Sequence, residues 1–336
     1  TKILLASLVI ALLSSCKKED PFREPPKVEP TYHFELYVDY WNPQGNNPQI
    51  LFDQLNTSPE VKIDLKKTIM GVPVPPHFSV VSIDNVRIID EQLKNFEISD
   101  IQAYEWRKDI EEWKNDVEFI MTYASVDELD VILALDASAS MGTNFNQVKA
   151  YASAFADKIF TANQHSRVGI VDFSDKINQL NLSNNPQEVI TYINSIQQGP
   201  FTTLYEAVNL GIDELDNSSA DSKTILTFTD GTDNNSKPLF TPEYLVQKIE
   251  DANNPINSFT IGLEGYGGVD KPVLEKLTAN GGVASFPKDI NQLQTVFEDF
   301  SKSIANAYHL TYTRNQQIIP ADKPIKLKFV INAKMK

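Results

Sequence analysis

The sequence predicts two kinds of structure. The middle of the chain is expected to form an α/β fold, a doubly wound, mainly parallel sheet flanked by helices. N-terminal and C-terminal strands are expected to form a β-rich, sandwich-like domain. Three observations predict this. From Asp130 onward, short apolar runs alternate with segments of helical periodicity. The run 131–135, Val-Ile-Leu-Ala-Leu, is apolar throughout, as in a strand buried on both faces. The flanking segments 32–125 and 308–336 carry strand patterns instead.

The α/β region is expected over residues 126–307. Apolar runs predict strands at 131–135, 167–174, 176–182, 224–229, 256–263 and 283–286. Helical spacing and capping residues predict helices that begin near 146 and 186 and that span 204–215, 241–252, 270–277 and 291–307. Asn185-Pro186-x-Glu188, for example, offers an N-cap, a proline at the first helical position and an acid in the first turn.

The flanking segments are expected to pair with each other. Alternating patterns predict strands at 32–40, 78–83, 86–89, 117–123, 308–313 and 325–331, and a strand with a turn at 93–98. Residues 104–113 fit either a helix or a strand. The two C-terminal strands are too short to fold alone, so we expect them to join the N-terminal strands around the inserted α/β region. Packing is the favoured role of Trp41, Trp106 and Trp113, with a binding surface as the alternative.

The first thirty residues resemble an export and anchoring signal. Lys2 precedes the apolar segment 3–13, and Leu13-Ser14-Ser15-Cys16 resembles the lipobox of bacterial lipoproteins. The resemblance implies a signal peptide over 1–15 and a lipid anchor at Cys16. Residues 16–31 then form a proline-rich tether. Lys17-Lys18-Glu19-Asp20 resembles the tag of lipoproteins exposed on the bacterial outer membrane, and a solvated tether is the alternative.

Composition excludes several classes of function. The formal charge of −15 over 336 residues argues against nucleic acid as a partner. Because Cys16 is the only cysteine, the chain forms no internal disulfide and no cysteine-based metal site.

Three short segments combine the residue types of a metal site. Asp136-x-Ser138-x-Ser140 follows the strand 131–135 directly, Thr202 precedes a helix, and Asp230 follows the strand 224–229. Parallel strands present their carboxyl ends at one edge of a sheet, where ligands bind. Carboxylate and hydroxyl oxygens suit a divalent cation such as Mg²⁺. Taken alone, Asp-x-Ser-x-Ser fits a turn or a helix cap equally well.

Together these segments resemble the von Willebrand factor A domain and its metal-ion-dependent adhesion site. The resemblance rests on Asp136-x-Ser138-x-Ser140, on Thr202-x-Leu204-Tyr205 and on Thr229-Asp230-Gly231. It implies that Asp136, Ser138, Ser140, Thr202 and Asp230 bind Mg²⁺, with Mn²⁺ or Ca²⁺ as alternatives. Thr203 is the fallback for Thr202.

The remaining polar residues of these loops have simpler interpretations. Ser174, Thr229 and Thr232 are expected to be ordinary loop or turn hydroxyls, and Asp172 and Asp233 to cap, support or face solvent. None of the four histidines, His33, His77, His165 and His309, lies close to these motifs in sequence. Phosphate-binding and nucleophile motifs are also absent from the sequence, so we expect no enzyme.

The resemblance implies a binding protein. Its metal would capture a Glu or Asp carboxylate of a protein partner, and the anchor at Cys16 would hold it in the outer membrane, facing outward. The alternative is a structural or assembly subunit of an envelope complex, in which the metal only stabilises the fold.

Overall fold

The computed structural model describes most of the chain after residue 30. The described residues are 31–41, 49–56, 61–64, 67–71, 78–90, 96–115, 119–125, 128–252, 256–264, 268–280, 282–305, 308–314 and 325–335. The chain divides into two units, Thr1–Pro30 and Thr31–Lys336. The expected signal peptide, Cys16, most of the tether and His77 lie outside the described residues. No helix in the described part is long and apolar enough to cross a membrane.

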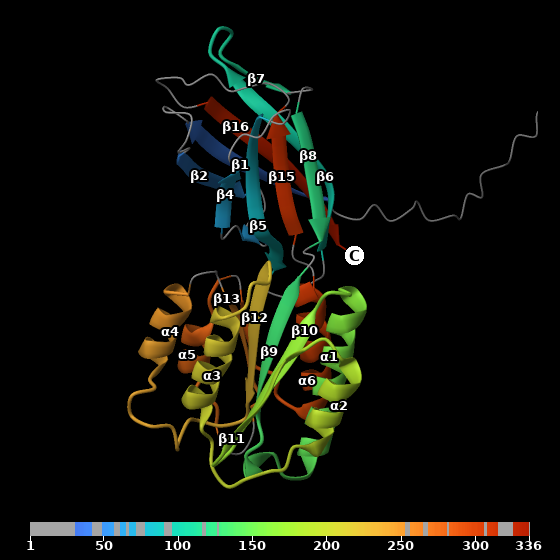
Figure 1. The fold of residues 1–336 in the computed structure, drawn as a ribbon, viewed down its shortest axis with the longest axis vertical. Helices are drawn as coiled ribbons and strands as arrows, with labels where there is room; N and C mark the ends of the chain where they lie inside the picture. Colours follow the sequence, from blue (N-terminus) through green and yellow to red (C-terminus); the bar gives the residue numbers. More distant parts are fainter. Residues whose placement is uncertain are drawn as a thin grey trace, which may run out of the picture. The chain divides into compact units, whose positions relative to one another are not determined.

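A six-stranded sheet forms the centre of the α/β region. Its strands lie in the order β11 (Ile177–Ser183), β10 (Arg167–Phe173), β9 (Leu129–Asp136), β12 (Ser222–Thr229), β13 (Ile256–Gly262) and β14 (Ala284–Ser285). All neighbours are parallel except β10 and β11. Figure 1 shows β9 and β12 side by side in the middle of this sheet. The predicted fold class is confirmed.

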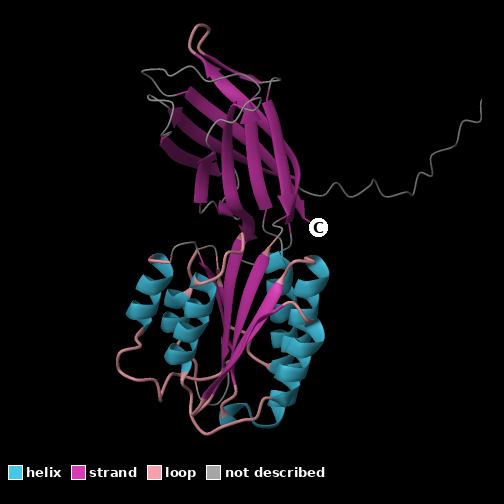
Figure 2. Ribbon diagram, viewed as in Figure 1, coloured by secondary structure: helices cyan, strands magenta, loops and turns pink. Residues whose placement is uncertain are grey.

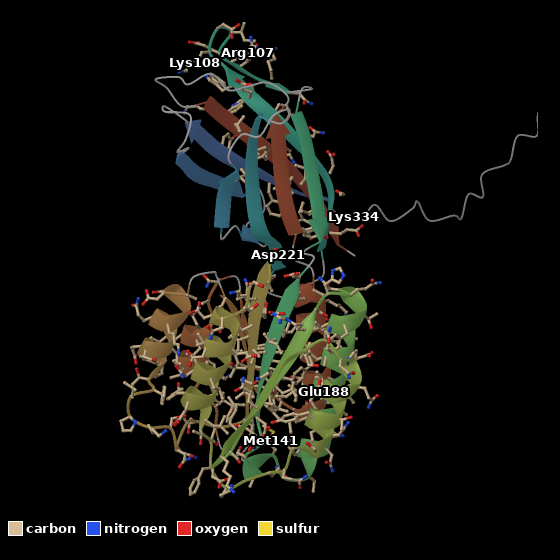
Figure 3. The ribbon with its side chains drawn as sticks, in the orientation of Figure 1. Arg107, Lys108, Met141, Glu188, Asp221 and Lys334 are labelled. Carbon is tan, nitrogen blue, oxygen red and sulfur yellow. The ribbon has the colours of Figure 1, made fainter. Side chains whose placement is uncertain are left out.

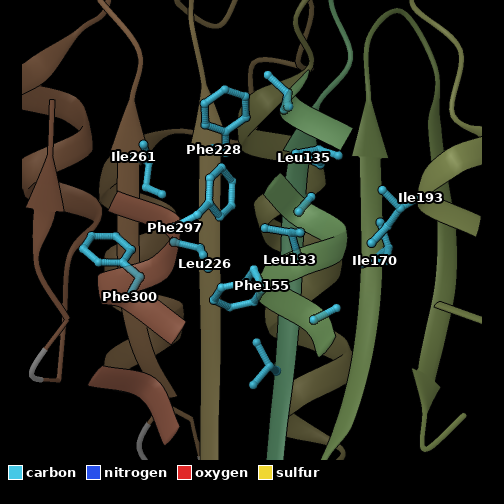
Figure 4. Close-up of a cluster of buried hydrophobic side chains, with 14 of the residues drawn as sticks. Leu133, Leu135, Phe155, Ile170, Ile193, Leu226, Phe228, Ile261, Phe297 and Phe300 are labelled. Atoms are coloured by element: carbon cyan, nitrogen blue, oxygen red, sulfur yellow. The ribbon is translucent and has the colours of Figure 1, made fainter. Parts of the chain in front are cut away.

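Helices cover both faces of the sheet, as Figure 2 shows. Helices α1 (Phe145–Ala162), α2 (Pro186–Ser195) and α6 (Ile290–Ala305) contribute to one apolar core, and α3 (Leu204–Asp216), α4 (Pro242–Glu250) and α5 (Lys271–Leu277) to the other. Alternate residues of β9 enter the two cores. Leu133 and Leu135 pack toward the first, shown in Figure 4, and Ile132 toward the second.

Local capping sets where three of these helices begin. The side chain of Asn185 accepts hydrogen bonds from the backbone N–H groups of Gln187 and Glu188, and Pro186 occupies the first turn of α2. Thr241 caps α4 and Asp270 caps α5 in the same way. The sequence therefore predicts these helix starts to within one residue.

Two antiparallel sheets make up the β-rich part. The first has the order β2 (Gln49–Asn56), β1 (Thr31–Trp41), β16 (Ile325–Met335), β6 (Phe96–Arg107), β7 (Glu112–Asn115). The second has the order β3 (Val61–Asp64), β5 (Phe78–Asp90), β15 (Tyr308–Arg314), β8 (Phe119–Ser125), and β4 (Lys67–Gly71) also pairs with β5. The C-terminal strands β15 and β16 thus pair with strands that precede the α/β region.

Two expectations for this part need correction or completion. Residues 78–83 and 86–89 are one continuous strand, β5, in which Asp84 pairs with Lys67 of β4 and the register against β15 shifts between Ile83 and Val86. Residues 104–113, which by sequence fit either a helix or a strand, contain the end of β6, a turn and the start of β7. Trp106 pairs with Trp113 across that hairpin, with ring centroids 5.4 Å apart. Both rings are half-buried, as packing predicts, whereas the Trp41 side chain lies outside the described residues.

The parallel strands bring the predicted metal-site segments to one edge of the central sheet. β9, β10 and β12 end there, and a short 3₁₀ helix, η1 (Ala139–Asn144), follows β9. Figure 3 shows Met141 of η1 at this end of the sheet and Asp221, just before β12, at the other. Gly142, with φ of 51°, separates two turns within η1, a conformation that favours glycine.

Candidate metal centre

Asp136 ends β9 and is completely buried. Its Oδ1 accepts a hydrogen bond of 2.7 Å from the backbone N–H of Ser138. Its Oδ2 accepts one of 2.5 Å from the Thr229 hydroxyl at the end of β12. Burial raises the pKa of Asp136 to about 6, although both hydrogen bonds favour the ionised form. The carboxylate is thus held in one orientation by two neighbouring strand ends.

Ser138, Ser140 and Asp230 lie together beside Asp136. The Ser140 hydroxyl donates to Oδ1 of Asp230 over 2.6 Å, and the Ser138 hydroxyl lies 3.5 Å from the same oxygen. The two serine hydroxyls are 2.7 Å apart. Burial raises the pKa of Asp230 as well. Four of the five predicted ligands therefore form one connected polar cluster.

Thr202 reaches this cluster from the loop before α3. Its backbone N–H donates to the Asn234 side-chain oxygen over 2.9 Å, and its carbonyl accepts from the Asn234 N–H over 3.0 Å. These bonds tie the loop of Thr202 to the loop that follows Asp230. A Cβ added to Gly231 would stand 3.7 Å from the Thr202 hydroxyl, so that hydroxyl faces the Thr229-Asp230-Gly231 turn.

The structure distinguishes Thr202 from the fallback, Thr203. The Thr203 hydroxyl donates to the Ser174 carbonyl and accepts from the Asn235 amide over 2.9 Å. Among the described residues, no hydrogen bond engages the Thr202 hydroxyl. Thr202 is therefore the threonine whose oxygen remains available at the cluster.

The described part of the chain provides no cationic partner for either carboxylate of the cluster. Among the described residues, no Lys, Arg or His forms an ion pair with Asp136 or Asp230. The described part of the chain also contains no group of three or more His, Cys, Asp or Glu side chains placed to hold a metal. A cation bound here would therefore depend on two carboxylates together with hydroxyl oxygens.

Thr229 has a larger role than the sequence suggests. Its hydroxyl donates to Asp136 and accepts from the backbone N–H of Gly231 over 3.1 Å. It thereby fixes the carboxylate of Asp136 and the turn that carries Asp230. The interpretation as an ordinary turn hydroxyl was incomplete. A threonine before Asp-Gly gives no sequence signal of a bond to a strand 93 residues away.

The other polar residues support the surrounding loops. Asp233 accepts from the backbone N–H of Tyr205 over 2.9 Å, at the first turn of α3. Asp172, in β10, accepts from the Tyr192 hydroxyl over 2.7 Å and from the Asn178 amide over 2.9 Å. Ser174 supplies the carbonyl that binds Thr203, and Thr232 is exposed. Neither acid joins the hydrogen-bonded cluster.

This donor set fits a hard divalent cation. Two buried carboxylates without a counter-charge destabilise each other, and a cation between them would relieve that cost. Neutral hydroxyls add oxygen ligands without neutralising the metal further, and Mg²⁺ readily completes its octahedron with water. A cation held by so few charges keeps an affinity for one more anion.

The chain matches a known protein family. The family model of the von Willebrand factor type A domain matches residues 130–299, about half of the chain. No curated protein sequence matches.

Several solved structures resemble the chain. Proximal thread matrix protein 1 of the mussel byssus, in a structure with a zinc-occupied MIDAS motif, aligns with a TM-score of 0.47 and 16% identity, over 57% of this chain and 49% of its own. The vWF domain of the type V pilus tip protein Mfa5 from Porphyromonas gingivalis aligns with a TM-score of 0.42 and 12% identity, over 54% of this chain and 96% of its own. The pilus adhesin SpaC from Lactobacillus rhamnosus GG, in its open conformation, aligns with a TM-score of 0.45 and 10% identity, over 83% of this chain and 43% of its own. The chain thus spans about half the length of the mussel protein.

Proposed function

Because the chain belongs to the von Willebrand factor type A domain family, we propose that it is a metal-dependent binding protein. Asp136, Ser138, Ser140, Thr202 and Asp230 hold a divalent cation, and the cation binds a Glu or Asp carboxylate of a protein partner. Mg²⁺ is the proposed ion, with Mn²⁺ and Ca²⁺ as alternatives.

One observation carries this proposal. Asp136 and Asp230 are both buried, both have raised pKa values, and neither is paired with a cationic side chain within the described residues. Buried carboxylates are normally paired or bind a metal. The hydroxyls of Ser138 and Ser140 come from the loop after β9, the Thr202 hydroxyl comes from the loop before α3, and Asp230 lies in a third loop, after β12. A purely structural turn would need no such convergence of three loops.

We propose binding and not catalysis as the use of the metal. Metal-assisted hydrolysis needs a base or nucleophile placed beside the cation. His165 precedes β10, at the end of the sheet opposite to the cluster. The cluster itself offers only the oxygens that would hold the ion.

We further propose that the protein is a lipoprotein of the bacterial outer membrane. The support is the sequence around Cys16, where an apolar segment and small residues precede the cysteine. Lipid chains at Cys16 would anchor the chain, and the proline-rich tether would hold the α/β region away from the membrane surface.

Isothermal titration calorimetry, in which Mg²⁺ alone is added to the full chain, tests the metal site. We expect saturable binding of one ion, lost in Asp136→Ala and in Asp230→Ala. Asp221→Asn is the matched control, because Asp221 is an exposed carboxylate at the opposite end of the same sheet. Unchanged titration in both site variants would refute the assignment of the ligands.

A second candidate function follows from the same burial. A cation between Asp136 and Asp230 would also stabilise the fold, which suits a structural or assembly subunit of an envelope complex. Thermal unfolding with Mg²⁺ or EDTA measures stabilisation. Retention of Glu-containing peptides measures capture. Stabilisation without any capture would favour the structural role.

A further inference from the structure

Phe201 is an exposed aromatic residue within the metal-site loops. Only four large apolar side chains are exposed among the residues whose side chains are described, namely Ile110, Phe201, Leu239 and Tyr244. The side chain of Phe201 is 50% exposed. Its neighbour in sequence, Thr202, is a proposed ligand of the metal. Single exposed apolar residues are common on protein surfaces, so exposure alone assigns no role.

The loop holds Phe201 in a fixed place. On one side, Gly199 exchanges backbone hydrogen bonds with Ala137 and Ala139, over 3.0 and 2.8 Å. On the other side, Thr202 is bound to Asn234 through two hydrogen bonds. Gly199 also fits closely, because a Cβ there would overlap the Ser174 side chain. Phe201 is thus preorganised, and binding to it would cost little loop entropy.

The exposed residues that neighbour the proposed ligands in sequence are uncharged. The exposed residues within two positions of a proposed ligand are Ala139, Ser140, Gly142, Pro200, Phe201 and Thr232. The Asp175 carboxylate lies against Gly199 and accepts from the Ser174 hydroxyl over 3.2 Å. In the loop after Asp230, two charged side chains are engaged elsewhere. Lys237 pairs with Glu206 over 2.6 Å, and Asp233 binds the first turn of α3. The residues next to the ligands offer no cation to a second acid, and the Asp175 carboxylate would repel one, so this neighbourhood suits apolar groups beside the metal-bound acid.

We propose that Phe201 is the docking anchor for an apolar side chain that lies next to the partner's metal-bound carboxylate. The inference rests on the proposed function. Adjacent Cα atoms are about 3.8 Å apart, so Phe201 is one residue spacing from Thr202, and the neighbour of the bound acid is one such spacing from that acid. The partner's recognition segment is accordingly an acid flanked by apolar residues. A polyacidic segment would be disfavoured by the Asp175 carboxylate beside Gly199.

Two bead-displayed peptide libraries with a fixed central Glu test this proposal. The flanking positions are apolar in one library and polar in the other. The full chain is applied in Mg²⁺ or in EDTA. We expect Mg²⁺-dependent retention on both libraries, on the order of tenfold stronger on the apolar one. Phe201→Ala should abolish that preference, while retention on the polar library stays unchanged.

Controls separate this proposal from the one on which it rests. Ile110→Ala removes a comparably exposed apolar side chain from the β-rich part and should keep the preference. Titration with Mg²⁺ alone should be the same for Phe201→Ala and the unchanged chain, because Phe201 provides no ligand. Equal retention on both libraries in Mg²⁺ would refute the role of Phe201 and leave metal-dependent capture standing. Equal retention in Mg²⁺ and EDTA on both libraries would refute both.

Discussion

Strand β9 carries a buried aspartate near each end, and the two aspartates have different hydrogen-bond partners. Asp130, near the start of the strand, is 1% exposed, and Asp136, at its end, is 0% exposed. Arg167 donates to both oxygens of Asp130, over 2.8 and 2.5 Å, and the Ser218 hydroxyl also binds it. Asp136 receives only uncharged donors. The chain thus supplies a cationic partner to Asp130, whereas no cationic side chain among the described residues pairs with Asp136.

The contrast teaches that burial alone does not mark a metal site. Two aspartates on one strand are both buried, and the candidate site differs in that no cationic side chain in the described part of the chain pairs with Asp136. The bidentate Arg167 pair is a complete charge balance. The same balance at Asp136 would need a metal ion.

Removal of Arg167 should leave the buried carboxylate of Asp130 without its cationic partner. Arg167→Ala leaves Asp130 buried with one hydroxyl as its partner, and we expect a loss of about 2–3 kcal/mol in unfolding free energy. The estimate lies at the low end for buried pairs because the Arg167 side chain is 42% exposed. Urea unfolding followed by helical circular dichroism measures it, since the described helices all belong to the α/β region. Asp130→Asn added to Arg167→Ala should recover part of the loss, and equal stability of all three chains would contradict the prediction.

At Asp136 the same kind of experiment should have the opposite sign. Burial raises the pKa of Asp136 to about 6, so its charge opposes folding at neutral pH in the absence of metal. Asp136→Asn removes the charge and keeps an oxygen for the Ser138 N–H. In EDTA near neutral pH we expect it to stabilise the protein by about 1 kcal/mol. The same urea series measures this, and a destabilisation comparable to that of Arg167→Ala would mean that Asp136 has an undetected cationic partner.

Much of this site is predictable because its signals are local. An apolar run that ends in Asp136-x-Ser138-x-Ser140 shows both a buried strand and a cluster of oxygens at its carboxyl end. Pro186 and Pro242, with their capping residues, set two helix starts. The sequence does not reveal the donors of each carboxylate, because Thr229 and Asp136 meet only when β12 pairs with β9.

Two other features cannot be predicted from the sequence, because they too depend on pairing between distant strands. Asp84 and Asn85 favour a turn locally, yet β5 continues past them because β4 pairs as far as Asp84 and β15 pairs again at Val86 after a register shift. Arg167 reaches Asp130 only because β10 and β9 pair in parallel. Long-range pairing thus decides which acids are neutralised.

Acidity offers a smaller test of the comparison. The folded-state pKa of Asp136, about 6, lies above its ordinary value of 3.8. The cost of its charge to the free energy of folding is therefore absent below about pH 3.8 and complete above about pH 6. Metal binding needs the ionised form, and below pH 6 the ion must displace a proton. From about pH 7.5 to about 5.5 we expect Mg²⁺ affinity to fall about fourfold. Titration calorimetry at both values checks this. The raised pKa of Asp230 acts in the same direction, and a pH-independent affinity would contradict both.

The smallest expected effect comes from Thr229, which links the two strand ends that carry the acids. Thr229→Val removes the hydroxyl from Oδ2 of Asp136 and from the Gly231 N–H while it keeps the shape of the side chain. Asp136 then loses a donor that favours its ionised form, so protons compete better with the metal. We expect Mg²⁺ affinity to fall about two- to threefold near neutral pH, a net loss within the usual range for one hydrogen bond. Thr229→Ser keeps the hydroxyl and should retain the affinity. Ser218→Ala makes the matched change at Asp130, where Arg167 already balances the charge, and should leave Mg²⁺ binding unchanged. If Ser218→Ala weakened Mg²⁺ binding as much as Thr229→Val, the two ends of β9 would not be independent.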